Sequence, residues 1–418
     1  MSIAGKKNTV EISDILLGDV WLCGGQSNMQ WGLEKTARAK RDIPAATHPK
    51  IRLVTLTGHA QTPAADIKWK GTQTDWQLCS PATVKLFSAV GYYFGLDLHK
   101  KLNVPIGLIM TAEGSTPLMP WISAQSQQSN PHFKPILELY ETYPARSAAY
   151  RIKRKAYDEG LKKSKAEGTP APKFPGHFEG YFFESPGWMY NARIAPLAPF
   201  SIKGVIWYQG ENEAIYKRTD SYKYFFPALI EDWRGLWGRE DLPFLYVQLA
   251  ANAGKSKGVP EESHWAEVRD GQRRTLKLDH TAMVVITDIC SSALHPPEKI
   301  AVGERLAGAA EVIAYGKKKI YTGPLLKAVQ FENGKAKVSF THTGTGLKVQ
   351  GEALKGFELA GENRKFYLAG AEVVDGNHVL VHSDKVQAPK FVRYSWANHA
   401  LGNLFNKENF PTSCFETD

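Results

Sequence analysis

The stretch Asp19-Val-Trp-Leu-Cys-Gly-Gly-Gln-Ser-Asn-Met29 decides the fold of this chain. Its first five residues form a short apolar run, which is typical of a strand buried on both faces. The two glycines that follow allow a tight turn, and Ser27 then stands where a helix begins. A serine at such a turn either caps the helix or exposes its hydroxyl at the carboxyl edge of a sheet. The stretch therefore predicts an α/β fold and a candidate nucleophile.

Further apolar runs alternate with helical patterns over residues 19–322. The runs are Val104–Met110, Ile202–Tyr208, Leu242–Leu249 and Ala282–Asp288. Helical patterns cover residues 88–102, Tyr222–Trp237 and Glu298–Tyr315. Because buried strands that alternate with helices are typical of a parallel sheet covered on both faces, we expect a three-layer α/β/α domain.

The remaining regions differ in character. Residues 126–187 are expected to be an insertion, first a basic helix and then a Pro/Gly-rich loop. From residue 323 the pattern changes to strand alternation, which predicts a C-terminal β-sandwich over 323–418. Residues 1–18 are expected to be the remnant of an N-terminal β segment, whose last strand, Thr9–Leu17, pairs with that sandwich.

Composition and charge narrow the class of protein. The 418 residues carry 52 Lys+Arg and 42 Asp+Glu, and 43% are hydrophobic, which excludes a wholly disordered chain. Residues 151–165 alone hold seven basic and two acidic residues, half of the net charge of +10. No zinc-finger spacing or aromatic RNA-binding signature accompanies this run, so we expect no nucleic-acid partner. No apolar run approaches the roughly 20 residues of a membrane helix, so we expect no membrane partner.

Cofactors, metals and compartment leave few signals. The four cysteines form no Cys-x-x-Cys pair, and we expect Cys23 and Cys290 to be buried free thiols. His378 and His382 would lie roughly 13 Å apart on a strand, too far to share a metal. No P-loop or dinucleotide fingerprint occurs, so we expect no cofactor and no metal. The first residues lack an apolar signal core, which leaves the localisation open: the protein is cytoplasmic, or it is periplasmic or secreted if the N-terminus is truncated.

Two further strand ends carry polar side chains. Trp207-Tyr-Gln-Gly-Glu-Asn212 provides the Gln209 amide and the Glu211 carboxylate, and the run that ends at Asp288 leads to His295. A lone histidine is usually structural, so the interpretation depends on the three strand ends together. The carboxyl ends of parallel strands share one edge of a sheet, which places serine, Gln/Glu and histidine there in chain order. This arrangement suggests a serine hydrolase with His295 as the general base.

These blocks resemble the signature blocks of the sialate O-acetylesterase family, which belongs to the SGNH-hydrolase superfamily of carbohydrate esterases. The resemblance is carried by Gly-Gln-Ser-Asn-Met from Gly25, Trp-Tyr-Gln-Gly-Glu-Asn from Trp207 and His-Pro-x-x-Lys-x-x-Val-Gly-Glu-Arg-Leu-Ala from His295, and it extends from about Asn8 to the C-terminus. It implies an SGNH-like fold for the α/β domain and hydrolysis of O-acetyl esters on carbohydrates.

The resemblance also implies residue roles. Ser27 would attack the acetyl carbonyl, and His295 would accept the proton. The oxyanion would be held by the backbone N–H groups of Ser27 and Gly114 and by the Gln209 amide. The residues expected around the sugar are Asn28, Trp31, Asn191 and Asn212.

One departure from the pattern of SGNH hydrolases leaves open which carboxylate completes a catalytic triad with Ser27 and His295. SGNH hydrolases usually carry an aspartate two or three residues before the histidine, where this chain has Ser292 and Ala293. Glu211 is the first candidate, because in esterases similar to these the glutamate of the Gln-Gly-Glu block meets the histidine. Asp288 is the second candidate, and a Ser–His dyad is the third possibility.

The sequence therefore predicts a serine esterase that removes O-acetyl groups from carbohydrates, with sialic acid as the first-choice substrate and an O-acetylated glycan as the partner. An acetylxylan or polysaccharide deacetylase is the alternative among enzymes, because the blocks encode ester hydrolysis and not the sugar. A catalytically weak glycan-binding protein is the alternative outside enzymes, because the aspartate is missing. The basic run is either a solvated helix face or a surface that attracts an acidic glycan.

Overall fold

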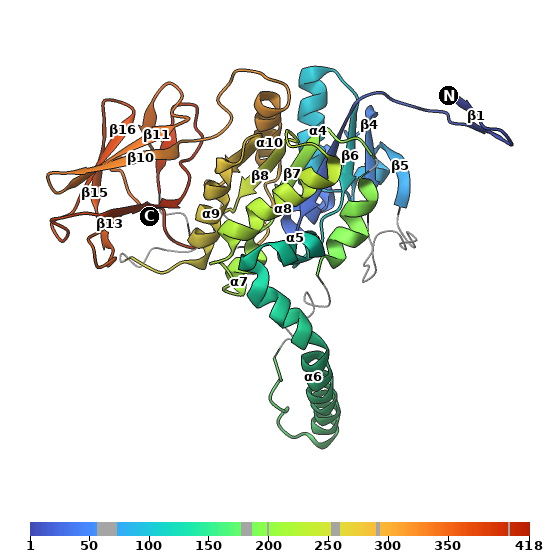
Figure 1. The fold of residues 1–418 in the computed structure, drawn as a ribbon, viewed down its shortest axis with the longest axis horizontal. Helices are drawn as coiled ribbons and strands as arrows, with labels where there is room; N and C mark the ends of the chain where they lie inside the picture. Colours follow the sequence, from blue (N-terminus) through green and yellow to red (C-terminus); the bar gives the residue numbers. More distant parts are fainter. Residues whose placement is uncertain (57–72, 177–185, 199, 252–259, 290–292, 400–401) are drawn as a thin grey trace.

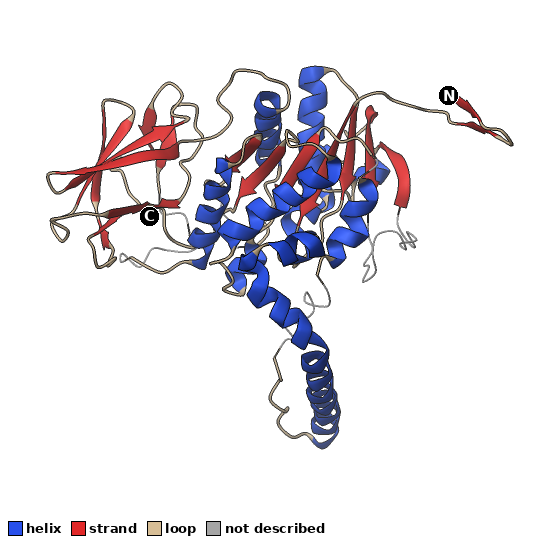
Figure 2. Ribbon diagram, viewed as in Figure 1, coloured by secondary structure: helices blue, strands red, loops and turns tan. Residues whose placement is uncertain are grey.

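The computed structural model describes the chain except residues 57–72, 177–185, 199, 252–259, 290–292 and 400–401 (Figure 1). Its centre is a seven-stranded sheet with helices on both faces (Figure 2). In spatial order the strands are β5 (Gln73–Cys79), β4 (His48–Thr55), β6 (Ile106–Met110), β3 (Asp19–Gly25), β7 (Gly204–Tyr208), β8 (Phe244–Gln248) and β9 (Thr281–Val285). Neighbouring strands are parallel except for the antiparallel pair β4–β5 at one edge.

The helices form the outer layers. The described α-helices are α1 (Ser27–Gln30), α2 (Ala39–Asp42), α3 (Pro81–Val84), α4 (Ala89–Leu102), α5 (Ala124–Ser129), α6 (Lys134–Glu167), α7 (Glu211–Ile215), α8 (Tyr222–Trp237), α9 (His264–Arg274) and α10 (Ile300–Ile313). Helices α4 and α10 pack together on one face, where Trp21 of β3 meets Phe94 of α4 edge-on at 5.0 Å between ring centroids. On the other face Trp207 of β7 meets Trp233 of α8 at 5.6 Å.

This architecture confirms the predicted α/β fold class. The five predicted apolar runs correspond to β3, β6, β7, β8 and β9, and two of the predicted helices, 88–102 and Tyr222–Trp237, are α4 and α8. Helix α10 begins at Ile300, two residues later than predicted, because the Pro296–Pro297 pair and its neighbours stay in the preceding loop. Strands β4 and β5, which form the antiparallel edge of the sheet, have no counterpart among the predicted runs.

The predicted insertion contains a long helical arm that projects from the body of the molecule (Figure 1). The arm is α6, which is longer than the basic run, and the residue that follows its last residue Glu167 is Gly168, with φ of 67°. The chain then returns along the helix without regular structure, and the Tyr150 hydroxyl donates to the Gly176 carbonyl at 2.9 Å. The left-handed backbone conformation at Gly168 favours glycine, because glycine has no Cβ that would clash with the backbone.

The C-terminal region folds as two antiparallel four-stranded sheets that share one core. The first sheet has the order β10 (Leu325–Glu332), β11 (Lys335–Thr341), β16 (His378–His382), β15 (Gly370–Val374), and the second β14 (Tyr367–Leu368), β13 (Phe357–Ala360), β17 (Phe391–Tyr394), β19 (Phe415–Glu416). A short pair, β12 (Leu347–Val349) and β18 (Leu404–Asn406), completes the module. Buried side chains of both sheets, Val338 and Leu359 among them, form its core. This is the predicted sandwich.

The N-terminal prediction was wrong in its pairing. Strand β2 covers only Thr9–Glu11 and pairs with β1 (Ser2–Ala4) in an exposed hairpin. This hairpin lies at the opposite end of the molecule from the sandwich (Figure 1). A local hairpin needs only the short turn between its strands, whereas pairing with the sandwich needs the chain to cross the whole sheet.

Three of the cysteines are described. Cys23, Cys79 and Cys414 are buried thiols, whereas Cys290 lies outside the described residues. In the described part of the chain, no helix is both long and apolar enough to cross a membrane.

Candidate active site

The polar blocks meet at the carboxyl edge of the parallel sheet, around the end of its central strand β3. Gly25 ends this strand with φ of 130°, and a Cβ there would lie 2.1 Å from the Tyr208 carbonyl oxygen of β7. The Gln26 side chain then accepts hydrogen bonds from the backbone N–H groups of Gly210 and Asn212, at 3.3 and 3.2 Å. A glycine and a buried amide therefore join the first block to the second.

Ser27 and His295 lie in direct contact. His295 Nε2 and Ser27 Oγ are 2.8 Å apart, although 268 residues separate them in the chain, and both residues are half-buried. The Trp31 ring stacks on the imidazole at 4.5 Å with an interplanar angle of 20°. Burial lowers the pKa of His295, and the positive charges of Lys299 and Lys35 lower it further. A neutral imidazole beside a hydroxyl is the arrangement that general-base activation needs.

A buried network behind Ser27 connects the chain segments of Ser27 and His295. Asn28 Nδ2 donates to Glu211 Oε1, and it also lies 3.2 Å from the carbonyl oxygen of Leu294, the neighbour of His295. On its other side Asn28 Oδ1 accepts from Lys299 Nζ at 2.5 Å. One side chain therefore links the nucleophile segment, the histidine loop and the start of α10. We refer to Asn28, Glu211 and Lys299 as the clamp.

The clamp holds two ionisable groups away from water. Glu211 is 2% exposed and Lys299 1%. Burial raises the pKa of Glu211 to about 7 and lowers that of Lys299 to about 7, and the opposite charge of the partner limits both shifts. Among the described residues Glu211 Oε2 has no hydrogen-bond partner. Buried ionisable groups of this kind keep their geometry only while their partners are in place.

The loop after β6 brings a backbone donor to the serine. The backbone N–H of Gly114 donates to Gln30 Oε1 at 2.9 Å. The amide oxygen of Gln30 therefore lies where another oxygen could accept the same hydrogen bond. The next residue, Ser115, has φ of 62°, and its carbonyl accepts from Asn212 Nδ2 at 2.7 Å. Asn212 therefore holds a loop whose backbone conformation is unfavourable for a residue with a Cβ.

Two buried side chains support the same loop from beneath. Gln209 is fully buried, and its amide nitrogen donates to Glu213 Oε2 and to the Thr116 carbonyl, the latter at 3.2 Å. The Arg193 guanidinium, 1% exposed, donates to the Thr111 and Ala112 carbonyls at 2.9 and 3.1 Å.

The predicted site residues thus fall into two groups. Ser27, His295, Trp31 and Gly114 gather at the sheet edge, whereas Asn28, Asn212 and Gln209 are buried beneath it. Asn191 is half-buried in a π-helical turn, Tyr190–Ile194. The substrate contacts of these asparagines and of Trp31, and the oxyanion role of Gln209, stay predictions.

The two candidate acids contact other groups. Glu211 bonds to Asn28, as described above. Asp288 lies at the surface and forms a two-point ion pair with Arg305, at 2.7 and 2.6 Å. Ala293 is described, whereas Ser292 lies outside the described residues. The identity of the acid that orients His295 therefore stays a prediction. Glu211 bonds to Asn28, the residue next to Ser27, whereas Asp288 bonds to Arg305.

Comparison with known proteins places this geometry in a family. A family model described as "Carbohydrate esterase, sialic acid-specific acetylesterase" matches residues 184–311. Rat sialate O-acetylesterase is 31% identical over 381 residues, which cover 84% of this chain and 67% of the relative. This chain belongs to the sialate O-acetylesterase family. The human sialate O-acetylesterase is 30% identical, and the match covers 84% of this chain and 64% of that protein.

A solved structure supports the same family. The crystal structure of a carbohydrate acetylesterase from Xanthomonas citri aligns with a TM-score of 0.81 and 34% identity, over 100% of this chain and 84% of that one. The chain spans about two thirds of the length of the curated relatives described above. The predicted family, fold class and assignment to the carbohydrate esterases are confirmed.

Several residues of this site were not predicted from the sequence. Lys299 belongs to the quoted His-Pro-x-x-Lys block, where a lysine within an otherwise apolar helix start was the available signal. Arg193 is an arginine inside the apolar stretch Met189–Ile194, a second signal of a buried charge. Gln30 and Glu213 gave no signal for their contacts with the backbone N–H groups of Gly114 and Leu118, because these donors lie in a loop that is distant in the sequence.

Proposed function

We propose that this protein hydrolyses O-acetyl esters on sialic acid by way of an acyl-serine intermediate. The observation that carries the proposal is the 2.8 Å contact between Ser27 Oγ and His295 Nε2 at the carboxyl edge of the sheet. The family supports O-acetyl ester hydrolysis on carbohydrates, and the names of the rat and human relatives support sialic acid as the sugar.

In the first half of the reaction, His295 Nε2 takes the proton of Ser27 as Oγ attacks the acetyl carbonyl carbon. The negative charge that develops on the carbonyl oxygen is held by the N–H groups of Ser27 and Gly114, and each such donor contributes about 3 kcal/mol to the transition state. The oxyanion replaces Gln30 Oε1 at Gly114. The C–O bond to the sugar then breaks, and His295 returns its proton to the departing sugar hydroxyl.

In the second half, water attacks the acetyl-Ser27 ester. His295 removes a proton from the water, the same donors hold the second oxyanion, and the bond to Ser27 Oγ breaks. The proton returns to Oγ, and acetate leaves. The Trp31 ring, stacked on the imidazole, restricts the rotation of the base during both halves.

The substrate assignment is tested by acetate release across a panel of O-acetylated sialic acids and O-acetylated xylan. Release from the sialic acids that is abolished by Ser27→Ala supports the proposal. Release from xylan alone overturns the sialate assignment and leaves the esterase mechanism in place.

Binding without hydrolysis is the remaining alternative from another class. An aryl acetate reports the esterase chemistry independently of the sugar. Absence of acetate release from this ester, together with retained glycan binding, would favour a glycan-binding protein.

The basic run of α6 bears on the charge of the substrate. Arg154 pairs with Asp158 at 3.0 Å, and Lys155 lies 3.9 Å from Glu159, so part of this charge is compensated within the helix. If the arm attracts an anionic glycan, neutralising Lys153, Arg154 and Lys155 weakens the salt dependence of KM for that substrate. An unchanged salt profile assigns the run to a solvated helix face.

A further inference from the structure

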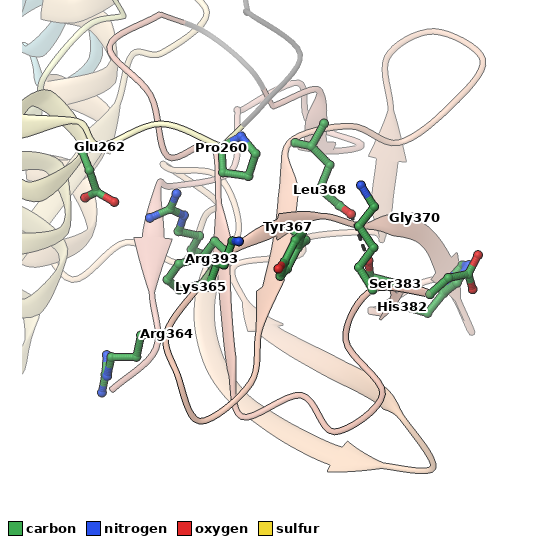
Figure 3. A pocket seen from close by; sticks show the side chains of 13 residues that line it. Pro260, Glu262, Arg364, Lys365, Tyr367, Leu368, Gly370, His382, Ser383 and Arg393 are labelled. Atoms are coloured by element: carbon green, nitrogen blue, oxygen red, sulfur yellow. Dashed lines mark hydrogen bonds between the residues drawn. The ribbon is translucent and has the colours of Figure 1, made fainter.

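A cavity of about 760 Å³ is lined by residues of the C-terminal sandwich and of the loop before α9 (Figure 3). Among the described residues, its lining shares none with the site around Ser27. The cavity opens beside β14, the edge strand of the second sheet of the sandwich. Its size is within the range of sites that hold small molecules.

The Tyr367 ring and the side chains of Lys365 and Lys385 line this cavity. Tyr367 of β14 lies between Arg393 and Lys365 on one side and the His382 side chain on the other (Figure 3). The Nζ atoms of Lys365 and Lys385 are 5.5 and 5.8 Å from the centroid of the Tyr367 ring. The ring is half-buried, so part of its surface is available to a ligand.

The two lysines differ from the arginines of the cavity in their pairing. Arg393 is 2% exposed and forms an ion pair with Glu358, and Arg364 lies 3.9 Å from Glu416. Within the described part of the chain, Lys365 and Lys385 have no carboxylate within ion-pair distance. The arginines therefore serve the internal structure, and the lysines leave positive charge in the cavity.

Two carboxylates also line the cavity, those of Glu262 and Asp384. Within the described part of the chain, neither lies within ion-pair distance of Lys365 or Lys385. His382 adds a hydrogen-bonding ring at the rim, where Gly370 makes room for it: a Cβ at 370 would lie 2.9 Å from the imidazole. An aromatic face beside uncompensated ammonium groups matches a ligand with an apolar C–H face and a negative charge.

We propose that this cavity binds a carboxylated sugar of a glycan chain. The Tyr367 ring packs on the C–H face of the sugar, and Lys365 and Lys385 pair with its carboxylate. Sialic acids and uronic acids share this chemistry. Because the chain is a carbohydrate esterase, a second glycan site on the same molecule raises the local concentration of substrate around Ser27 without taking part in the reaction.

The test measures binding in the full-length Ser27→Ala protein by saturation-transfer NMR with three probes: 3′-sialyllactose, tri-galacturonate and lactose. We expect signals from one or both carboxylated probes that weaken as the salt concentration rises, and none from lactose. Tyr367→Ala and the double variant Lys365→Gln/Lys385→Gln each weaken binding at least about fivefold.

The matched control is Lys335→Gln/Lys355→Gln, which removes the same charge from exposed sandwich residues that do not line the cavity. It retains binding. In the Ser27 background, all variants turn over an aryl acetate like the unmodified protein, which shows that they are folded. This inference rests on the proposed function only in the choice of sialyllactose as one probe, so a missing sialate esterase activity leaves it standing. Equal binding of lactose and the carboxylated probes, or unchanged binding by both cavity variants, overturns it.

Discussion

The surface and the interior of the active site use different chemistry for different tasks. At the surface Ser27 and His295 are half-buried neutral groups 2.8 Å apart, positioned to react. Directly beneath them the clamp of Asn28, Glu211 and Lys299 consists of an amide and two nearly inaccessible ionisable groups. The clamp bonds to the chain segments of both the serine and the histidine, so we expect the contact between these two residues to depend on the buried groups beneath them.

The largest effect is expected at the surface. Ser27→Ala removes the nucleophile and lowers kcat for an aryl acetate by about four orders of magnitude or more, because triad members act as a unit. The free energy of unfolding changes by less than about 0.5 kcal/mol, since the side chain is half-buried and small. Steady-state kinetics and urea denaturation measure the two quantities.

The control for this prediction is the double variant Ser27→Ala/His295→Ala. It loses no more activity than either single variant if the two residues form one unit. If the losses of activity of the two single variants add in the double variant, Ser27 and His295 do not act as one unit.

The second-largest effect is expected from a substitution in the clamp, which lowers both the free energy of unfolding and kcat. Lys299→Met leaves Asn28 and Glu211 without the buried ammonium group, and we expect a loss of about 3 kcal/mol in the free energy of unfolding. The kcat for an aryl acetate falls with it, because the distance between Ser27 and His295 is no longer fixed. Chemical denaturation and kinetics check both changes.

A double-mutant cycle separates the clamp from simple loss of packing. Lys299→Met/Glu211→Gln removes both charges and is expected to recover part of the stability that Lys299→Met loses. If the two losses simply add, the residues act independently and the clamp is not a unit.

The two candidate acids give the third effect. Glu211→Gln is expected to lower kcat about tenfold or more, because Glu211 accepts from the residue next to the nucleophile. Asp288→Asn is expected to stay within about twofold of the unmodified protein, because its partner is Arg305 at the surface. If Glu211→Gln keeps full activity while Asp288→Asn loses it, the ranking of the two acids is wrong.

The smallest effect concerns the pH profile. The general base must be neutral, and burial together with nearby positive charge lowers the pKa of His295, so the acid limb of kcat/KM lies below the ordinary histidine range. Lys35→Gln removes one of these charges, which raises the pKa and moves the acid limb to higher pH. Lys40→Gln, also an exposed lysine, is the control and leaves the limb in place. If the acid limb shifts equally in the Lys35→Gln and Lys40→Gln variants, the charge of Lys35 has no specific effect on the pKa of His295.

The sequence was sufficient to predict that Ser27 and His295 lie together, and it was not sufficient to predict the buried residues that hold them. Ser27 and His295 follow apolar runs that can be recognised as strands, and parallel strands end at a common edge, so their proximity follows from local patterns. Gln30 accepts from Gly114 and Glu213 accepts from the Leu118 backbone N–H, each across a long separation in the chain, and no spacing in the sequence encodes those two contacts. The pairing of the N-terminal hairpin was mispredicted for a related reason: strand propensity does not specify the partner strand.

By itself the sequence determined the alternation of buried strands and helices, the three blocks at the strand ends and the membership in an esterase family. Only the tertiary structure decided that Asn28 faces inward to Glu211 and Lys299, that Asp288 pairs with Arg305, and that a cationic aromatic cavity forms in the sandwich. The physical reason is that hydrophobic periodicity reports which face of an element is buried. The partner of a buried polar group depends instead on which segments the fold brings within about 3 Å.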